Sequence, residues 1–230
     1  MSIGKAIVLL GYFLIIPNEI IELPKFKTLN IHPSLLPQYR GASPLPTAML
    51  DDTKKTGVSI MQLDAEMDHG PIIAQKIIEI LNWPTYEEFE EMMAIVGAHL
   101  LAETLPRWID GKIVPTPQDH SKATYTKKIT KEDGLIEFTV DELNNLHKLD
   151  SKKAYEIFRK IQAFHEWPQV YFFIEKTGPN EDPNKKIRVK ITQASFKKLD
   201  DNEGLLFIEK VIPEGKKEMS YDDFLRGYLQ

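Results

Sequence analysis

The first half of the chain alternates short apolar runs with helix-like segments, and this alternation is what most constrains the fold. Residues 6–10 form a continuous apolar run, which is typical of a strand covered on both faces. Shorter strand-like runs follow at 28–31, 57–63 and 71–80, and the longest helical pattern covers 85–109. Strands that alternate with helices are typical of the α/β class. We therefore expect an α/β sheet domain over residues 1–112.

The chain changes character after residue 112. Residues 113–120 are rich in proline and polar side chains, so we interpret 113–132 as a linker. A helical pattern at 152–164 then precedes three strand-like runs, at 169–175, 186–192 and 205–211. This order predicts a small, mostly antiparallel β domain over residues 133–230.

Composition excludes several kinds of site. None of the 230 residues is cysteine, which rules out disulfides, thiolate nucleophiles and Cys-ligated metals. The net charge of −5 lies entirely in residues 1–112, and the rest is neutral with separate basic clusters. Net charge alone therefore does not indicate a polyphosphate binder. No apolar run is long enough to span a bilayer, so the expected compartment is the cytoplasm.

One segment departs from the pattern of a packed core. Asn30 and His32 are two residues apart, so on an extended strand their side chains point to the same face. Asp68 lies in a turn between two predicted strands. An amide, an imidazole and a carboxylate that meet at strand ends would form a proton-transferring site, although each piece alone also suits a structural turn. No spacing indicates a metal site, and His69 is better interpreted as a loop residue.

Longer motifs around these residues resemble those of the folate-dependent formyltransferases. The motifs are NIHPSLLP at 30–37 with YRGA at 39–42, GVSIMQL at 57–63 and MDHGPII at 67–73. Gly11 and Tyr12, with Pro17, resemble the family's pterin-contacting strand and loop. In the second half, the segments similar to members that formylate methionyl-tRNA are 123–125, 163–168, 213–219 and 224–227.

The resemblance implies a truncated, doubly wound, mostly parallel α/β sheet, followed by a small C-terminal domain similar to an OB-type β-barrel that binds tRNA. It implies transfer of a formyl group from 10-formyltetrahydrofolate to the amino group of methionyl initiator tRNA, with no metal. Amine attack on a formyl carbon passes through a tetrahedral oxyanion, which needs hydrogen-bond donors. Asn30 and protonated His32 would donate to it. Asp68 would hold and charge His32 and help to remove the proton of the attacking ammonium.

The resemblance also implies two sets of binding residues. Those implied to contact folate are Gly11, Tyr12, Ser34, Leu35, Leu36, Pro37 and Asp64. Those implied to contact the tRNA are Arg40, Lys127, Lys128, Lys185, Lys186 and Arg188. A structural hydrogen bond that holds the loop is an equal alternative for Arg40, and a solvated surface is an equal alternative for the lysines.

The chain also departs from the family pattern. From the resemblance we expect the βα units that precede the Gly11–Tyr12 strand in family members to be absent or supplied elsewhere. We also expect a pair of strands to be missing between Phe196 and Leu205, and residues 176–186 resemble an insertion. We expect the open edge at 6–10 to pair with a missing segment, or with another chain in a dimer. Two other functions stay open: a formyltransferase acting on a nucleotide-linked amino sugar, and a catalytically idle folate- or RNA-binding remnant that needs a partner segment.

Overall fold

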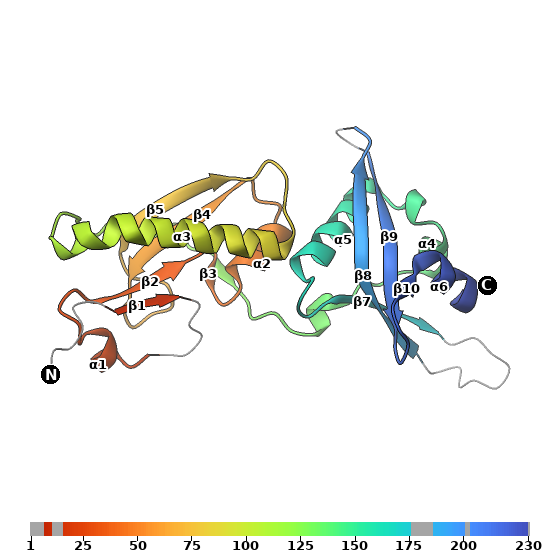
Figure 1. Cartoon of the computed structure of the whole chain (residues 1–230), viewed down its shortest axis with the longest axis horizontal. Coiled ribbons are helices and arrows are strands. Elements are labelled where there is room, and N and C mark those ends of the chain that lie inside the picture. The colour runs from red at the N-terminus through yellow and green to blue at the C-terminus, as the bar shows by residue number, and fades with distance from the viewer. Residues whose placement is uncertain (1–6, 11–15, 176–185, 201–202, 230) are drawn as a thin grey trace. The chain divides into compact units, whose positions relative to one another are not determined.

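The computed structural model describes residues 7–10, 16–175, 186–200 and 203–229. The chain divides into two compact units, residues 1–128 and residues 129–230 (Figure 1). None of the helices in the described ranges is long and apolar enough to cross a bilayer.

The first unit is built on a four-stranded sheet. Its strands are β1 (Ile7–Leu10), β2 (Thr28–His32), β4 (Lys55–Gln62) and β5 (Ile72–Glu79), in the order β1-β2-β4-β5. Its helices are α1 (Asn18–Ile21), α2 (Pro44–Leu50) and α3 (Tyr86–Ile109), with a 3₁₀ turn η1 (His120–Lys122). Strand β1 runs parallel to β2, whereas β2 with β4 and β4 with β5 are antiparallel.

Helix α3 begins where the sequence provides a cap. The Thr85 side chain accepts from the backbone N–H of Glu88, and the Glu88 carboxylate accepts from the backbone N–H of Thr85. Such a capping box satisfies two amides that the first helical turn leaves open. The hydrogen bonds to Thr85 hold the pKa of Glu88 below its usual range. Phe89 and Met93 are buried, so this face of the helix packs on the sheet.

The segment after α3 packs back onto the first unit. Thr116 exchanges two backbone hydrogen bonds with Ile72, and β6 (Tyr125–Thr126) pairs in parallel with β3 (Arg40–Gly41). Residues 113–128, which we expected to be part of a linker, therefore lie within the first compact unit. Backbone pairing of this kind is not visible in a proline-rich sequence, because it depends on residues far away along the chain.

The second unit is an antiparallel sheet with helices. Its strands are β7 (Val170–Glu175), β8 (Lys186–Lys198), β9 (Gly204–Pro213) and β10 (Met219–Ser220), in the order β10-β9-β8-β7. Its helices are α4 (Val140–Asn144), α5 (Ser151–Ala163) and α6 (Tyr221–Tyr228), with 3₁₀ turns η2 (Glu132–Gly134) and η3 (Leu146–Lys148). Phe172 and Phe224 are fully buried and meet edge to face in its core. The Tyr221 hydroxyl donates to the carbonyl of Leu143 (2.8 Å), and burial raises the pKa of Tyr221.

The expected architecture is confirmed: an α/β unit is followed by a separate antiparallel β unit. The sheet of the first unit is mixed in the described residues, with one parallel pair beside two antiparallel pairs. For the β4–β5 pair the reason is local, because the short connection 63–71 contains no helix and so returns β5 antiparallel to β4.

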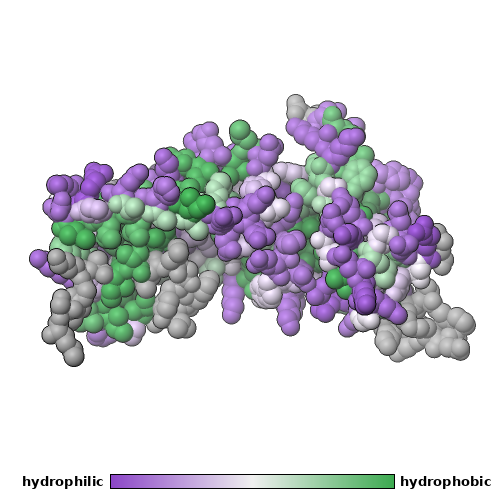
Figure 2. Space-filling model, viewed as in Figure 1, coloured by the Kyte–Doolittle hydropathy of each residue, from purple (hydrophilic) through white to green (hydrophobic). Residues whose placement is uncertain are grey.

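Strand β1 forms one edge of the described sheet, as expected for residues 6–10. On the face shown in Figure 2, hydrophobic residues of the first unit gather near β1, β2 and α1. Ile20 and Leu23, near this edge, are 46% and 56% exposed. Pairing of this edge with another chain stays a prediction.

A side chain at position 57 on β4 would clash with neighbouring atoms of the first unit. A Cβ there would lie 2.0 Å from the carbonyl oxygen of Lys76 on β5 and 2.7 Å from Cδ2 of Leu35. Because a backbone oxygen cannot move without breaking the β4–β5 pairing, we expect Gly57→Ala to destabilise the first unit by roughly 3 kcal/mol. Gly227→Ala in α6 is the matched control, since nothing lies within 4 Å of its added Cβ. Urea unfolding curves measure both, and equal midpoints for the two variants would contradict the predicted clash.

Candidate functional site

Asn30 and His32 lie on the face of β2 that points away from α3. The side chain between them, Ile31, points toward the helix: a Cβ added at Gly97 of α3 would lie 3.0 Å from Cγ2 of Ile31. Because side chains alternate along a strand, Asn30 and His32 share the opposite face, as predicted. Asn30 is half-buried, whereas the other residues of β2 are buried.

The side chain of His32 is almost fully buried, at 6% exposed. Its Nε2 lies 2.8 Å from the backbone carbonyl oxygen of Tyr39. A carbonyl oxygen can only accept, so Nε2 carries a proton and donates it. The other ring nitrogen, Nδ1, faces Oδ1 of Asp68 at 3.7 Å, which is longer than a hydrogen bond. Nδ1 is therefore the nitrogen of His32 that is available for chemistry.

Asp68 is held from its other side. Its Oδ2 accepts from the backbone N–H of Gly41 (2.7 Å), so only Oδ1 is directed at His32. The backbone of Asp68 has a φ of +49°, which an aspartate tolerates better than most residues. Gly41 has a φ of +106°, and a Cβ there would lie 2.8 Å from the carbonyl oxygen of Thr126. Glycine at position 41 thus permits the close approach of strand β3 to Thr126 of strand β6.

The loop 33–37, in which residues 34–37 were predicted to contact folate, is fixed to the sheet by hydrogen bonds. The Ser59 hydroxyl on β4 donates to the carbonyl of Ser34 (2.6 Å) and accepts from the backbone N–H of Leu36 (3.0 Å). Gln75 on β5 donates to the carbonyl of Leu36 (2.9 Å), and Ser34 closes the loop by donating to the carbonyl of Gln38 (2.6 Å). The loop backbone is therefore fixed directly beside His32.

Arg40 does not present its charge to solvent. It is 1% exposed, and its guanidinium donates twice to Oε1 of Gln118, once to the hydroxyl of Tyr125 (3.1 Å) and once to Nδ1 of His120 (2.9 Å). These contacts favour the alternative in which Arg40 holds the loop. Sequence reasoning missed Gln118 and His120, because an isolated glutamine or histidine in a polar segment carries no local signal of burial.

Asp64 and His69, in the connection between β4 and β5, also contact each other. Asp64, predicted to contact folate, accepts from Nδ1 of His69 through Oδ2 (2.7 Å), and its Oδ1 accepts from the backbone N–H of Glu66 (3.0 Å). The ring of His69 stacks on His120 with centroids 4.0 Å apart. His69 is therefore part of the loop packing. Among the residues that the structure describes, no three His, Cys, Asp or Glu side chains are grouped so as to hold a metal ion.

The predicted tRNA contacts lie on both units. Lys127 and Lys128 are exposed in the first unit, and Lys186 (exposed) and Arg188 (half-buried) lie on β8 in the second. Arg188 lies over the ring of Tyr171, 5.7 Å from its centroid. Gly11, Tyr12 and Lys185 lie outside the described residues, as does most of the predicted insertion at 176–186.

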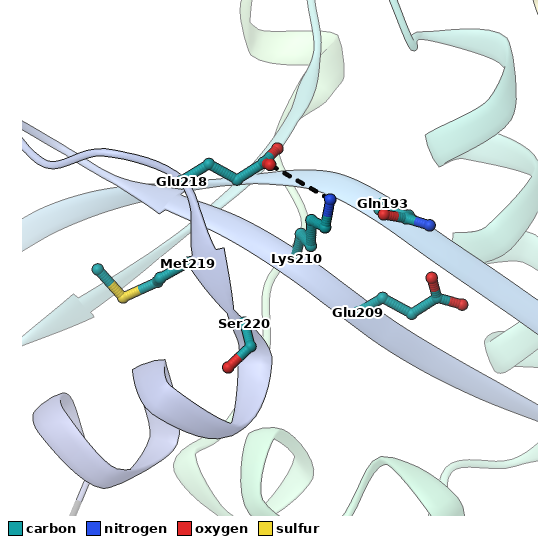
Figure 3. A pocket seen from close by; sticks show the side chains of 6 residues that line it. All are labelled: Gln193, Glu209, Lys210, Glu218, Met219 and Ser220. Atoms are coloured by element: carbon teal, nitrogen blue, oxygen red, sulfur yellow. Dashed lines mark ion pairs between the residues drawn. The ribbon is translucent and has the colours of Figure 1, made fainter.

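Within the described part of the chain, each of the two units has a hollow. One, of about 150 Å³, lies beside the His32 loop and is lined by Gln38, Tyr39, Thr47, Asp51, Thr124 and Tyr125. Burial and the neighbouring Asp51 carboxylate raise the pKa of the Tyr39 phenol, so it stays neutral. The other, of about 470 Å³, lies by β9 and β10 in the second unit, where Lys210 faces Glu218 at 3.5 Å (Figure 3). Neither hollow is lined by Asn30, His32 or Asp68.

Comparison with known proteins decides the family. Residues 4–105 match the family model described as formyl transferase, and residues 128–229 match the formyl transferase C-terminal domain. The chain belongs to the formyltransferase family. It is 34% identical over 236 residues to a methionyl-tRNA formyltransferase of Sulfurihydrogenibium sp. (strain YO3AOP1), which covers 96% of this chain and 70% of that relative.

Solved structures show the same fold. A methionyl-tRNA formyltransferase from Clostridium thermocellum matches with a TM-score of 0.57 and 21% identity, over 90% of this formyltransferase chain and 78% of that one. HypX from Aquifex aeolicus, in complex with tetrahydrofolic acid, matches with a TM-score of 0.67 and 18% identity, over 98% of this chain and 39% of that one. The resemblance seen in motifs 30–42 and 67–73 is thus confirmed at the level of the family.

Proposed function

We propose that this formyltransferase moves a formyl group from 10-formyltetrahydrofolate to the amino group of methionyl initiator tRNA. The observation that carries the proposal is the arrangement of His32 and Asp68: Nδ1 and Oδ1 face each other at 3.7 Å, on the strand face that also bears Asn30. The methionyl-tRNA formyltransferase relatives support the acceptor, and the tetrahydrofolate in the HypX structure supports the donor.

The proposed chemistry uses the free atoms of this site. The amino nitrogen attacks the formyl carbon, and the carbonyl oxygen becomes an oxyanion that accepts from the Asn30 amide and from Nδ1–H of protonated His32. Oδ1 of Asp68 takes the proton that the attacking nitrogen loses, since Oδ2 is already bonded to Gly41. The oxyanion then re-forms the carbonyl as the bond from the formyl carbon to the folate nitrogen breaks, and this nitrogen takes the proton from Oδ1 of Asp68.

The donor would lie against the pinned loop 33–37. Because Ser59 and Gln75 fix its backbone, the surface of the loop is formed without the donor. A preformed surface reduces the ordering entropy that binding must overcome. We propose this loop, with Asp64, as the folate-contacting part of the described site.

The acceptor is tested by direct competition. The chain is incubated with 10-formyltetrahydrofolate and an equimolar mixture of methionyl initiator tRNA and a nucleotide-linked 4-amino sugar, and both products are quantified. The proposal predicts formyl-methionyl-tRNA as the main product. Formylation of the sugar alone would contradict the tRNA assignment, and a folded chain that binds folate without transfer would support the idle-remnant alternative.

Basic residues on β8 give a prediction for tRNA affinity. Lys186 and Arg188 lie two residues apart on one strand face, next to Glu175 and Phe173 of β7. If each contacts a phosphate, alanine at either position weakens binding for all tRNA sequences and reduces the slope of log K against log[salt] by about 1. Lys112→Ala, which removes an exposed lysine paired with Asp110, is the control. An unchanged salt slope for both β8 variants would remove this strand from the interface.

A further inference from the structure

Gln118 is buried although it lies in a segment with the composition of a linker. Both the oxygen and the nitrogen of its side-chain amide form hydrogen bonds, and the residue is 6% exposed. Oε1 accepts from Nη2 (2.6 Å) and Nε (3.2 Å) of Arg40. Nε2 donates to the backbone carbonyls of Asp68 (2.9 Å) and Gly70 (2.7 Å). Two lone pairs and two hydrogens are used, so the hydrogen-bonding capacity of this amide is filled.

The four contacts fix the orientation of the amide. Rotation by half a turn would place the oxygen against two carbonyl oxygens and the NH₂ group against a guanidinium. Each of the four hydrogen bonds would become a repulsion between like groups. Gln118 therefore needs a donor, Arg40, on one side and acceptor carbonyls on the other. An apolar side chain of the same size would have no such requirement.

These contacts close a ring through the proposed catalytic carboxylate. Gln118 binds Arg40, the next residue Gly41 donates to Oδ2 of Asp68, and the carbonyl of Asp68 accepts from Gln118. Asp68 is thus held at its backbone by one partner and at its carboxylate by another. A residue with a φ of +49° needs such restraint if its free oxygen is to stay directed at His32.

We propose that Gln118 is a positioning residue that fixes Asp68 opposite His32 for formyl transfer. This inference rests on the proposed function of the site. The amide of Gln118 is buried and filled by Arg40, Asp68 and Gly70, so in this proposal Gln118 acts on the reaction through Asp68. Its removal should therefore change turnover through the placement of a carboxylate, with little effect on how tightly either substrate binds.

Kinetics of two variants test this role. Gln118→Met keeps the length of the side chain and removes all four hydrogen bonds. Gln118→Glu keeps a partner for Arg40 but sets an oxygen against the carbonyls of Asp68 and Gly70. We expect both to lower kcat by about 10- to 100-fold with each KM changed less than about 2-fold. Gln162→Met in α5, a half-buried glutamine of the second unit, is the control and should match wild type.

A double-mutant cycle separates positioning from general structure. If Gln118 acts through Asp68, then Gln118→Met should cause little further loss in an Asp68→Asn background, because the carboxylate it places is already gone. Losses that multiply in the double variant would overturn the proposal. So would an unchanged kcat in both Gln118 variants of an active, folded enzyme.

Amide hydrogen exchange gives a readout that needs no activity. The Gly41 N–H bonds Oδ2 of Asp68, so its exchange should quicken by at least about 10-fold in Gln118→Met, while amides of the β4–β5 pairing keep their protection. Equal Gly41 exchange in variant and wild type would overturn the proposal even for an inactive chain. A wild type without transfer would contradict the proposed function, and the exchange result would still decide this inference.

Discussion

Asn30→Ala is expected to lower kcat/KM for formyl transfer by about 100- to 1000-fold, as removal of one oxyanion donor does in other acyl-transfer sites. The side chain is half-buried on an otherwise buried strand, so its truncation leaves the packing of Leu29 and Ile31 in place. The loss should therefore appear in turnover, while the free energy of unfolding changes by less than about 1 kcal/mol.

Asn82→Ala is the matched control, because Asn82 is an exposed asparagine of the same unit. It should keep the wild-type kcat/KM. Asp68→Asn completes the series: it keeps an oxygen for the Gly41 amide but removes the charge, and it should also lower kcat strongly. If Asn30→Ala retained more than about a third of wild-type activity, the oxyanion role of Asn30 would be wrong.

Arg40→Leu is expected to destabilise the first unit by about 3–5 kcal/mol. The change removes a buried guanidinium that donates to Gln118, Tyr125 and His120, and it leaves the Oε1 of a buried amide without a partner. Arg40→Lys should lie between leucine and wild type, since an ammonium keeps the charge but cannot reproduce the fork of donors.

Intrinsic fluorescence during urea unfolding measures this effect. Trp83 and Trp108 lie in the first unit, where their indole N–H groups donate to Asp52 and to the carbonyl of Phe26. Their emission reports on that unit, whereas the third tryptophan, Trp167, reports on the second unit. A loss below about 1 kcal/mol in Arg40→Leu would contradict the structural role and return Arg40 to the set of substrate contacts.

The sequence alone predicted the parts of this fold that depend on local pattern. Alternation on β2 placed Asn30 and His32 on one face, and the helical pattern at 85–109 agrees with α3 (Tyr86–Ile109). Strand β8 was expected to end at Thr192 but continues to Lys198. The extension packs Phe196 against Tyr155 and Phe158 of α5, and such long-range packing leaves no trace in a short window of sequence.

The hydrogen bonds that hold Asp68 in place could not be predicted from local sequence patterns. The motif at 67–73 identified Asp68, but its partners Gly41 and Gln118 are 27 and 50 residues away along the chain. Gln118 lies among prolines, where composition indicates a linker. The backbone pairing of Thr116, two residues before Gln118, with Ile72 brings the glutamine to the Asp68 loop. Contacts of that kind depend on the folded topology.

The central claim is that this chain transfers a formyl group through the Asn30–His32–Asp68 site. The most direct measurement follows radiolabelled formyl from 10-formyltetrahydrofolate onto methionyl initiator tRNA, with wild type and Asn30→Ala in parallel. We predict transfer by wild type that is proportional to enzyme concentration, and a rate at least about 100-fold lower for the variant. No transfer by a folded wild type, or equal rates for the two proteins, would contradict the claim.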